Sequence, residues 1–239
     1  MGECWGEGTA TFMILGNICT RSCGFCGVKT GRPDTVDWEE PEKVAKSIQI
    51  MKIKHAVITS VDRDDLTDMG SIIWAETIKS IRRLNPGITL ETLIPDFQGI
   101  KKHLDRIIAV KPEVISHNIE TVERLTREVR IQARYSRSLD VLKYLKSSGV
   151  NRTKSGLMLG FGESEDEVIK TIHDLRNANV DVLTIGQYLQ PSKKHLQVKN
   201  FIKPEIFKKY ETIALDLGFI HVESGPLVRS SYKAQKHIN

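Results

Sequence analysis

The sequence has few cysteines, and all four lie within the first 26 of its 239 residues. No pairing among them could tie down the remaining chain, which excludes the disulfide framework of a small secreted domain. Long apolar runs are also absent: no stretch approaches the roughly 20 residues that a membrane-spanning helix needs, and the N-terminus lacks the order of a secretion signal. These absences predict a cytoplasmic protein with no membrane partner, and they indicate metal or redox chemistry at the clustered cysteines.

Charge of one sign does not dominate, because 35 basic residues stand against 30 acidic ones and the net charge is +5. Lysine and arginine are mixed with acids along the chain, and the nearest approach to a basic tract, Lys193 and Lys194 with His195, is short. We therefore expect no nucleic-acid partner and favour an acidic protein instead.

Short apolar runs rich in β-branched residues alternate with amphipathic segments, as is typical of βα units around a parallel sheet. The predicted strands are residues 11–15, 55–59, 88–94, 114–117, 152–159 and 182–188. The predicted helices are residues 41–53, 71–84, 98–110, 138–148, 164–178 and 204–217. Six strands and six helices predict an α/β fold, an open (β/α)6 partial barrel of the TIM type with its functional groups on the loops after the strands.

A helix-capping signal supports these predicted boundaries. Ser164 stands three residues before Glu167 and predicts a capping box at the fifth helix. No repeat or linker interrupts the series, so residues 1–239 are expected to form a single domain. Residues 1–10 are then a short N-terminal segment and residues 219–239 a C-terminal extension.

Three of the cysteines, Cys19, Cys23 and Cys26, form the pattern CxxxCxxC in the segment CTRSCGFC, just after the first predicted strand. Three thiolates at this spacing can hold one [4Fe–4S] cluster and leave its fourth iron without a protein ligand. That iron can chelate the amino and carboxylate groups of S-adenosylmethionine (SAM), and an electron from the cluster can then break the sulfonium bond to give a 5′-deoxyadenosyl radical. The spacing therefore predicts a radical SAM centre with catalytic cysteines.

Two other interpretations of the triplet stay open. A zinc site normally takes four Cys or His ligands in paired knuckles, and the nearest histidine downstream is His55. The three thiols could also be unrelated to one another. Gly24 and Phe25 fit the cluster better, since a small residue allows close approach and an aromatic one shields a face.

Six segments, in unchanged order, carry a resemblance to a known family. They are ATFMILGNICTRSCGFCGVKTGRP (10–33), VITSVDRDDL (57–66), SHNIETV (116–122), TKSGLMLGFGE (153–163), GQYLQPS (186–192) and SGPLVRSSY (224–232). Over nearly the whole chain they resemble the lipoyl synthases. The resemblance implies insertion of two sulfur atoms, at carbons 6 and 8 of an octanoyl chain held on a lysine of a carrier domain, with two SAM molecules consumed.

The resemblance also implies partners and a second cofactor. The partners are an octanoylated lipoyl carrier domain or a glycine-cleavage carrier protein, and a reducing electron-donor protein. The sulfur comes from an auxiliary [4Fe–4S] cluster, which the family holds with cysteines in the pattern CxxxxCxxxxxC and a serine of an RSSY motif. Cys4 matches the last of those cysteines, and Ser231, in preference to Ser230, matches the serine. The first two cysteines are not in the sequence, and truncation upstream of Met1 is expected rather than a natural variant with borrowed ligands.

Seven further residues stand at predicted strand ends and are candidate contacts to SAM or substrate. They are Thr59, Ser60, Asn118, Glu120, Gly156, Gly160 and Gln187. The threonine and serine match positions that face the methionine part of SAM, the glycines match a motif that lets the backbone approach adenine, and the amides and the glutamate could bind ribose or the substrate amide. Turn, capping and barrel-end packing roles are the alternatives.

Charged residues also lie near the predicted barrel mouth. Lys29, Arg32 and Lys154 could receive an acidic carrier domain. The acidic run at residues 62–65, interleaved with Arg63, is expected to be a salt-bridged surface without a catalytic role.

Two rival functions remain beside the synthase. One is a radical SAM protein that cleaves SAM without inserting sulfur, because Cys4 alone remains of the auxiliary cysteines. About four irons per chain would fit this rival, and about eight an intact synthase. The other is a non-catalytic Fe–S or zinc-binding interaction protein, which would not cleave SAM.

Overall fold

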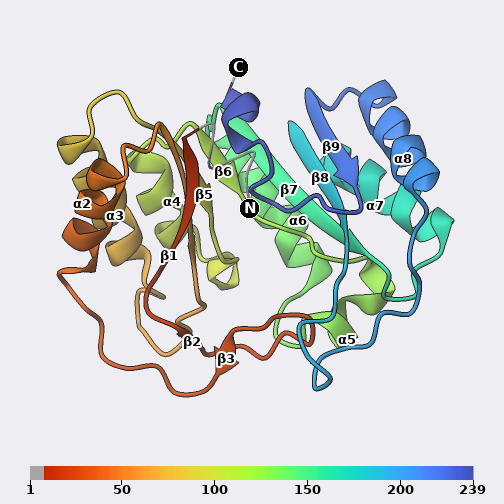
Figure 1. Ribbon diagram of the computed structural model, residues 1–239, viewed down its shortest axis with the longest axis horizontal. Helices are drawn as coiled ribbons and strands as arrows, with labels where there is room; N and C mark the ends of the chain where they lie inside the picture. The colour runs from red at the N-terminus through yellow and green to blue at the C-terminus, as the bar shows by residue number, and fades with distance from the viewer. Residues whose placement is uncertain (1–7, 239) are drawn as a thin grey trace. The chain divides into compact units, whose positions relative to one another are not determined.

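The computed structural model describes residues 8–238 and shows strands alternating with helices along the chain (Figure 1). Contacts within the chain divide it into two compact units. Among the described residues, the first unit holds residues 8–21, 28–116 and 233–238. The second holds residues 22–27 and 117–232.

The first unit is built on four parallel strands in the order β1, β4, β5, β6. Their bounds are Thr9–Ile14, His55–Ser60, Thr89–Leu93 and Val114–Ser116. Three helices, α2 (Glu40–Ile50), α3 (Ser71–Leu84) and α4 (Lys101–Ala109), lie side by side along these strands (Figure 1). Short elements complete the unit: the paired strands β2 (Ile18–Cys19) and β3 (Lys29–Thr30), and the 3-10 helices η1 (Phe97–Gly99) and η3 (Ala234–Ile238).

The second unit is built on three parallel strands, β7 (Arg152–Leu159), β8 (Val182–Gln187) and β9 (His221–Gly225). Every residue of β8 is buried, and its apolar side chains join a core that includes Leu157, Ile172 and Phe207. The helices are η2 (Glu123–Leu125), α5 (Thr126–Val129), α6 (Tyr135–Ser147), α7 (Glu165–Asn177) and α8 (Pro204–Asp216).

Helix α7 starts where its sequence signal predicts. The Ser164 hydroxyl accepts a hydrogen bond from the Glu167 backbone N–H at 3.3 Å, and the Glu167 carboxylate accepts one from the Ser164 N–H at 2.8 Å. Arg124 pairs with the same carboxylate at 2.7 Å. The hydrogen bond from Arg124, followed by those at Ser164, lowers the pKa of Glu167 to about 2. The predicted capping box is confirmed.

The helices pack through one apolar face each. In α3, the longest helix of residues 8–238 at 14 residues, Ile73, Trp74, Ile78 and Ile81 are buried, while Arg82 and Arg83 occupy its last turn. Basic residues there complement the helix dipole. Among the residues that the structure describes, no helix is long and apolar enough to cross a membrane.

All six predicted strands and six predicted helices are present, with shifts at their ends. Helix α4 begins at Lys101 and not at 98, because Phe97–Gly99 forms a separate turn in which Gln98 has φ 52°. The prediction of six strands was wrong in one respect, since β9 extends the second unit's sheet. The segment HVESG of β9 is only half-buried along its whole length and has no apolar run to signal a strand.

Candidate metal centre

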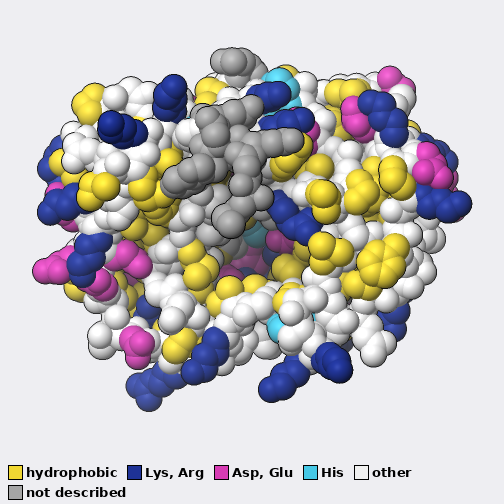
Figure 2. All heavy atoms as spheres, in the orientation of Figure 1, with side chains coloured by type: hydrophobic (Ala, Val, Ile, Leu, Met, Phe, Trp, Pro, Cys, Tyr) yellow, Lys and Arg dark blue, Asp and Glu magenta, His cyan; other side chains and the backbone are white. Residues whose placement is uncertain are grey.

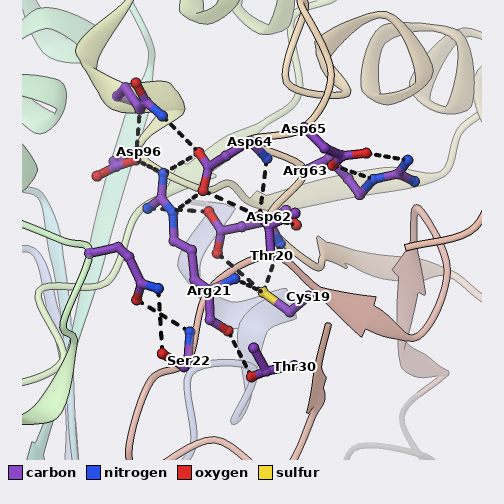
Figure 3. Close-up of polar contacts among 12 residues, drawn as sticks. Cys19, Thr20, Arg21, Ser22, Thr30, Asp62, Arg63, Asp64, Asp65 and Asp96 are labelled. Atoms are coloured by element: carbon purple, nitrogen blue, oxygen red, sulfur yellow. Dashed lines mark hydrogen bonds and ion pairs between the residues drawn. The ribbon is translucent and has the colours of Figure 1, made fainter. Parts of the chain in front are cut away.

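Cys19 ends strand β2 and lies in the first unit. Its Sγ accepts hydrogen bonds from the backbone N–H of Arg21 at 3.4 Å and of Asp62 at 3.3 Å (Figure 3). As a thiol it also donates to Asp62 Oδ2 at 3.8 Å. Two backbone donors aimed at one sulfur are contacts that a metal-bound thiolate can accept.

Cys23 and Cys26 lie in the second unit, on one tight turn of the chain. The Cys26 N–H donates to the Cys23 carbonyl at 3.1 Å. Gly24 between them donates to the Val129 carbonyl and accepts from the Leu196 N–H, both at 2.9 Å. A Cβ at Gly24 would lie 2.8 Å from Leu196 Cγ, so glycine is needed here for close packing. We call residues 23–26 the cysteine turn.

The chemistry of the three donors fits an iron–sulfur cluster. All three are partly exposed thiols within one eight-residue segment. Soft thiolate ligands at this spacing are what a [4Fe–4S] cluster takes. Between residues 8 and 238, no group of three His, Cys, Asp or Glu side chains is already gathered around a metal position. The fit therefore rests on the donor set and on the short chain that joins it.

A buried arginine that the sequence analysis did not single out anchors this segment. Arg21 is 6% exposed and pairs with three carboxylates (Figure 3). Its guanidinium lies 2.6 Å from Asp64, 2.8 Å from Asp96 and 3.3 Å from Asp62. Burial opposes its charge, but the hydrogen bond to Asp64 and the charges of Asp62 and Asp96 outweigh that cost and raise the pKa of Arg21.

These pairs join the cysteine segment to the ends of two strands. Asp62 and Asp64 follow β4, and Asp96 follows β5. The backbone N–H of Asp62 is also a donor to Cys19, so Arg21 helps to position that donor. The expected salt bridging of the acidic run is confirmed. The pairs do not lie on an exposed surface, however, because Arg21 and Arg63 are both buried. An arginine inside the cysteine segment and aspartates after two strands were the available signal.

The candidate pair at the end of β4 is half-buried. Thr59 and Ser60 are the last two residues of that strand. The Ser60 hydroxyl accepts a hydrogen bond from the indole N–H of Trp74 at 3.1 Å, which fixes the position of its oxygen. Its own proton remains available for donation.

Asn118, Glu120 and Gly156 come together in the second unit. The Asn118 amide donates to Glu120 Oε1 at 3.0 Å, and a Cβ at Gly156 would lie 2.8 Å from Asn118 Oδ1. Glu120 has φ 65° and bridges to β7 through its own N–H and carbonyl. Burial raises the pKa of Glu120, while Arg130 and Asn118 oppose that rise. The space beside Gly156 is thus filled by the protein's own amide.

Gly160 and Gln187 hold a loop in place. The Gln187 amide donates to the carbonyls of Leu159, Tyr188 and Asn200 at 3.0–3.1 Å and accepts from the Ile202 N–H at 2.9 Å. A Cβ at Gly160 would lie 2.3 Å from Gln187 Nε2 and 2.7 Å from the Asn200 carbonyl. These contacts account for both residues through packing, which the sequence analysis had offered as the alternative to cofactor contact.

Substituting alanine at Gly160 is expected to lower the free energy of unfolding by about 2–4 kcal/mol, from overpacking and from an alanine at positive φ. Gly149→Ala is the matched control, because Gly149 also has positive φ, 83° against 112°, but has no neighbour within 4 Å of a Cβ. Urea unfolding of both variants separates the cost of overpacking from the cost of an alanine at positive φ. Equal losses would show that the contact with Gln187 has no energetic weight.

The two residues predicted for an auxiliary cluster differ in what the structure says of them. Cys4 lies outside the described residues. Ser231 is half-buried in a turn closed by a hydrogen bond from the Tyr232 N–H to the Arg229 carbonyl at 2.9 Å. Arg229 in turn donates to the carbonyl of Gln187, at the end of β8.

The basic residues expected at the barrel mouth do not share one environment. Lys29 and Arg32 are exposed, as expected. Lys154 is 0% exposed inside β7, so its predicted part in receiving a partner was wrong. Its position in a strand buried along nearly its full length explains this.

Comparison with known proteins gives a family match. A family model described as the Radical SAM superfamily matches residues 13–175. A protein named lipoyl synthase from Flavobacterium psychrophilum is 77% identical over 238 residues, which cover 100% of this chain and 82% of that protein. One named lipoyl synthase, mitochondrial, from Nematostella vectensis is 77% identical over 239 residues, with the same coverage. A lipoyl synthase from Phocaeicola vulgatus is 57% identical and is covered to 84%.

Solved structures share the fold at low identity. The hydrogenase maturase HydG from Carboxydothermus hydrogenoformans matches with a TM-score of 0.70 and 15% identity, over 96% of this chain and 65% of that one. SuiB from Streptococcus suis, solved with S-adenosylmethionine, matches with 0.69 and 12%, over 96% and 48%. SuiB bound to its precursor peptide matches with 0.68 and 12%, over 91% and 49%. Together with the parallel strands and helices, these matches confirm the predicted α/β fold of the partial TIM-barrel type.

Proposed function

Because this chain belongs to the lipoyl synthase family of the radical SAM superfamily, we propose that Cys19, Cys23 and Cys26 are the ligands of its SAM-cleaving [4Fe–4S] cluster. The family's enzymes are sulfurtransferases that use [4Fe–4S] clusters and SAM to insert sulfur into an octanoyl group and form the lipoyl group. In our proposal, sulfur insertion depends on these three cysteines.

The observation that carries the assignment is the pair of hydrogen bonds that the Cys19 sulfur accepts. Two backbone N–H groups donate to its sulfur, and hydrogen bonds of this kind stabilise a cluster thiolate. When bound, the cluster and SAM supply the radical chemistry that removes hydrogen from unactivated C–H bonds, which acid–base groups cannot do. Within the first unit, Arg21 ties residues 19–21 to the loops that follow β4 and β5.

The polar residues at strand ends are assigned to binding. We propose that Thr59, Ser60, Asn118 and Glu120 contact SAM or the substrate. Support comes from their places at the carboxyl ends of strands and from the orientation that Trp74 gives to Ser60. Gly156, Gly160 and Gln187 contribute by packing that sets the shape of the second unit's strand ends.

The auxiliary cluster is assigned on sequence pattern. We propose Cys4 and Ser231 as two of its ligands, the serine oxygen being a weak ligand that iron can release. The half-buried turn around Ser231, tied to the end of β8 through Arg229, supports a fixed position for that hydroxyl.

The substrate is the octanoyl-lysine of a lipoyl carrier protein. We propose that the carrier is a dehydrogenase lipoyl domain or a glycine-cleavage carrier protein, that sulfur enters at carbons 6 and 8, and that a reducing protein supplies the electrons. The fold's capacity for a peptide substrate is supported by SuiB, which was solved with its precursor peptide.

The test is anaerobic reconstitution of the chain, followed by SAM, a reductant and an octanoylated carrier. Mass spectrometry of the carrier and release of 5′-deoxyadenosine are measured, on this chain and on one extended upstream by a CxxxxC segment. Lipoyl product with 5′-deoxyadenosine supports the proposal. Release of 5′-deoxyadenosine without lipoyl product from either form favours SAM cleavage alone, and no release at all would refute the cluster assignment.

A further inference from the structure

A long irregular loop joins β8 to α8. Residues 188–203, here called the β8–α8 loop, form no helix or strand, yet internal bonds order them. The Tyr188 hydroxyl donates to the Leu196 carbonyl at 2.7 Å, and the Gln190 amide donates to the His195 carbonyl at 3.0 Å. Loops of this length in compact domains are uncommon and are usually functional.

The inner side of this loop packs on the cysteine turn. The Leu196 N–H donates to the Gly24 carbonyl at 2.9 Å, and Leu196 fills the space that a Cβ at Gly24 would take. A Cβ at Gly27 would lie 3.5 Å from Pro191. A molecule held on the outer side of the loop is therefore held close to the cysteine turn.

The outer side of the loop is positively charged. Lys193, Lys194, Lys199 and Lys203 are exposed, and residues 188–203 contain no aspartate or glutamate. In the described part of the chain none of these four lysines has a carboxylate partner, whereas Lys208 and Lys209 on the adjoining helix α8 pair with Glu211 and Glu165. Figure 2 shows Lys and Arg side chains at the lower edge of the molecule, where Figure 1 places this loop.

The loop also exposes large apolar side chains. Phe201 is 74% exposed and Leu189 is 46% exposed, at its two ends. Exposed aromatic residues beside unpaired basic ones are typical of protein interfaces, in which the aromatic is buried as an anchor and the charges orient the partner. The same lysines would repel a basic partner.

We propose that the β8–α8 loop is the docking surface for the carrier protein, and that it recognises an acidic surface on that carrier. The inference rests on the proposed function, which makes a carrier protein the substrate. It follows from charge complementarity between four unpaired lysines and carboxylates of the partner, and from the loop's contact with the cysteine turn. Of the three basic residues expected to receive an acidic carrier, Lys154 is buried and cannot take part, whereas the four lysines of the loop are exposed.

The test compares Lys194→Glu with the matched control Lys143→Glu. Lys143 is exposed on α6 of the same unit and also lacks an ion pair in the described chain. Each reconstituted variant is assayed with an octanoylated, acidic carrier domain and with a short neutral octanoyl-lysine peptide. For Lys194→Glu we expect the KM for the carrier, relative to that for the peptide, to rise about 3- to 10-fold, and its dependence on salt to weaken. Lys143→Glu should leave the ratio within about 2-fold of the wild type.

The outcomes separate this inference from the proposed function. If wild-type protein converts both substrates and Lys194→Glu leaves the ratio of KM values unchanged, the docking surface is refuted and the function stands. If wild-type protein converts neither substrate, the proposed function itself fails. The inference would also be overturned if Lys194→Glu weakened binding of the protein to anionic lipid vesicles or to duplex DNA but left its binding to the carrier unchanged.

Discussion

Replacing Arg21 with methionine is expected to lower the free energy of unfolding by about 3–5 kcal/mol near neutral pH, a large part of the stability of a typical domain. Methionine keeps much of the side-chain volume but removes the guanidinium that pairs with Asp62, Asp64 and Asp96. Three carboxylates would then face one another beside the cysteine segment with no guanidinium between them. Urea unfolding of the protein without its cofactors measures the loss.

The loss should depend on pH in a defined direction. Burial alone would raise the pKa of Asp64, but hydrogen bonding and charge pairing with Arg21 hold it below its usual value. A lowered pKa in the folded protein contributes stability above the unfolded value of about 4, and this is lost as pH falls. Arg21→Met removes this contribution, which the wild type keeps above about pH 4 and loses as pH falls. The difference in free energy of unfolding between Arg21→Met and the wild type should therefore shrink as pH falls toward about 4.

Arg82→Met is the matched control for Arg21→Met. Arg82 belongs to the same unit and pairs with Glu113 at 3.1 Å, but its side chain is 38% exposed. An exposed pair contributes about 1 kcal/mol or less, so the control should unfold close to wild type. Equal losses in the two variants, or a loss at Arg21 that does not change with pH, would contradict the assigned role of the buried network.

Replacing Cys23 with alanine is expected to remove the SAM-cleaving cluster, with loss of about four irons per chain and of nearly all reductive SAM cleavage. Two remaining cysteines cannot replace the third thiolate, and the turn that joins Cys23 to Cys26 offers no other soft ligand. Iron and sulfide analysis, electron paramagnetic resonance of the reduced protein and 5′-deoxyadenosine release measure the effect.

Ser22→Ala is the control at the neighbouring position. Ser22 lies beside Cys23 and bonds with Gln132, so this variant alters the same segment without removing a thiol. It should keep its iron and its SAM cleavage. A Cys23→Ala protein that retained both would rule out the cluster assignment, whereas one that lost iron together with its fold, seen by circular dichroism, calls for Cys26→Ser as the second variant.

The sequence by itself determined the family, the fold class and the cysteine triplet. Each of these can be read along the chain: the CxxxCxxC spacing lies in one segment, the alternation of apolar strands with amphipathic helices is visible in short windows, and the family resemblance lies in the order of six segments. The strands β4 and β8 could be predicted because burial favours runs of apolar and β-branched residues there. Strand β9 could not, because a half-buried strand needs no such run.

The tertiary structure decided what the polar residues do. Gly160 matches a cofactor motif and Gln187 stands at a strand end, and the structure shows them packed against each other and against the loop at Asn200. Lys154 looked like a surface charge and is buried in β7. The position of Arg21 in the cysteine segment was a weak signal, because its importance comes from aspartates that follow two different strands. A side chain's partners depend on which strand ends meet in space, and spacing along one segment does not contain that information.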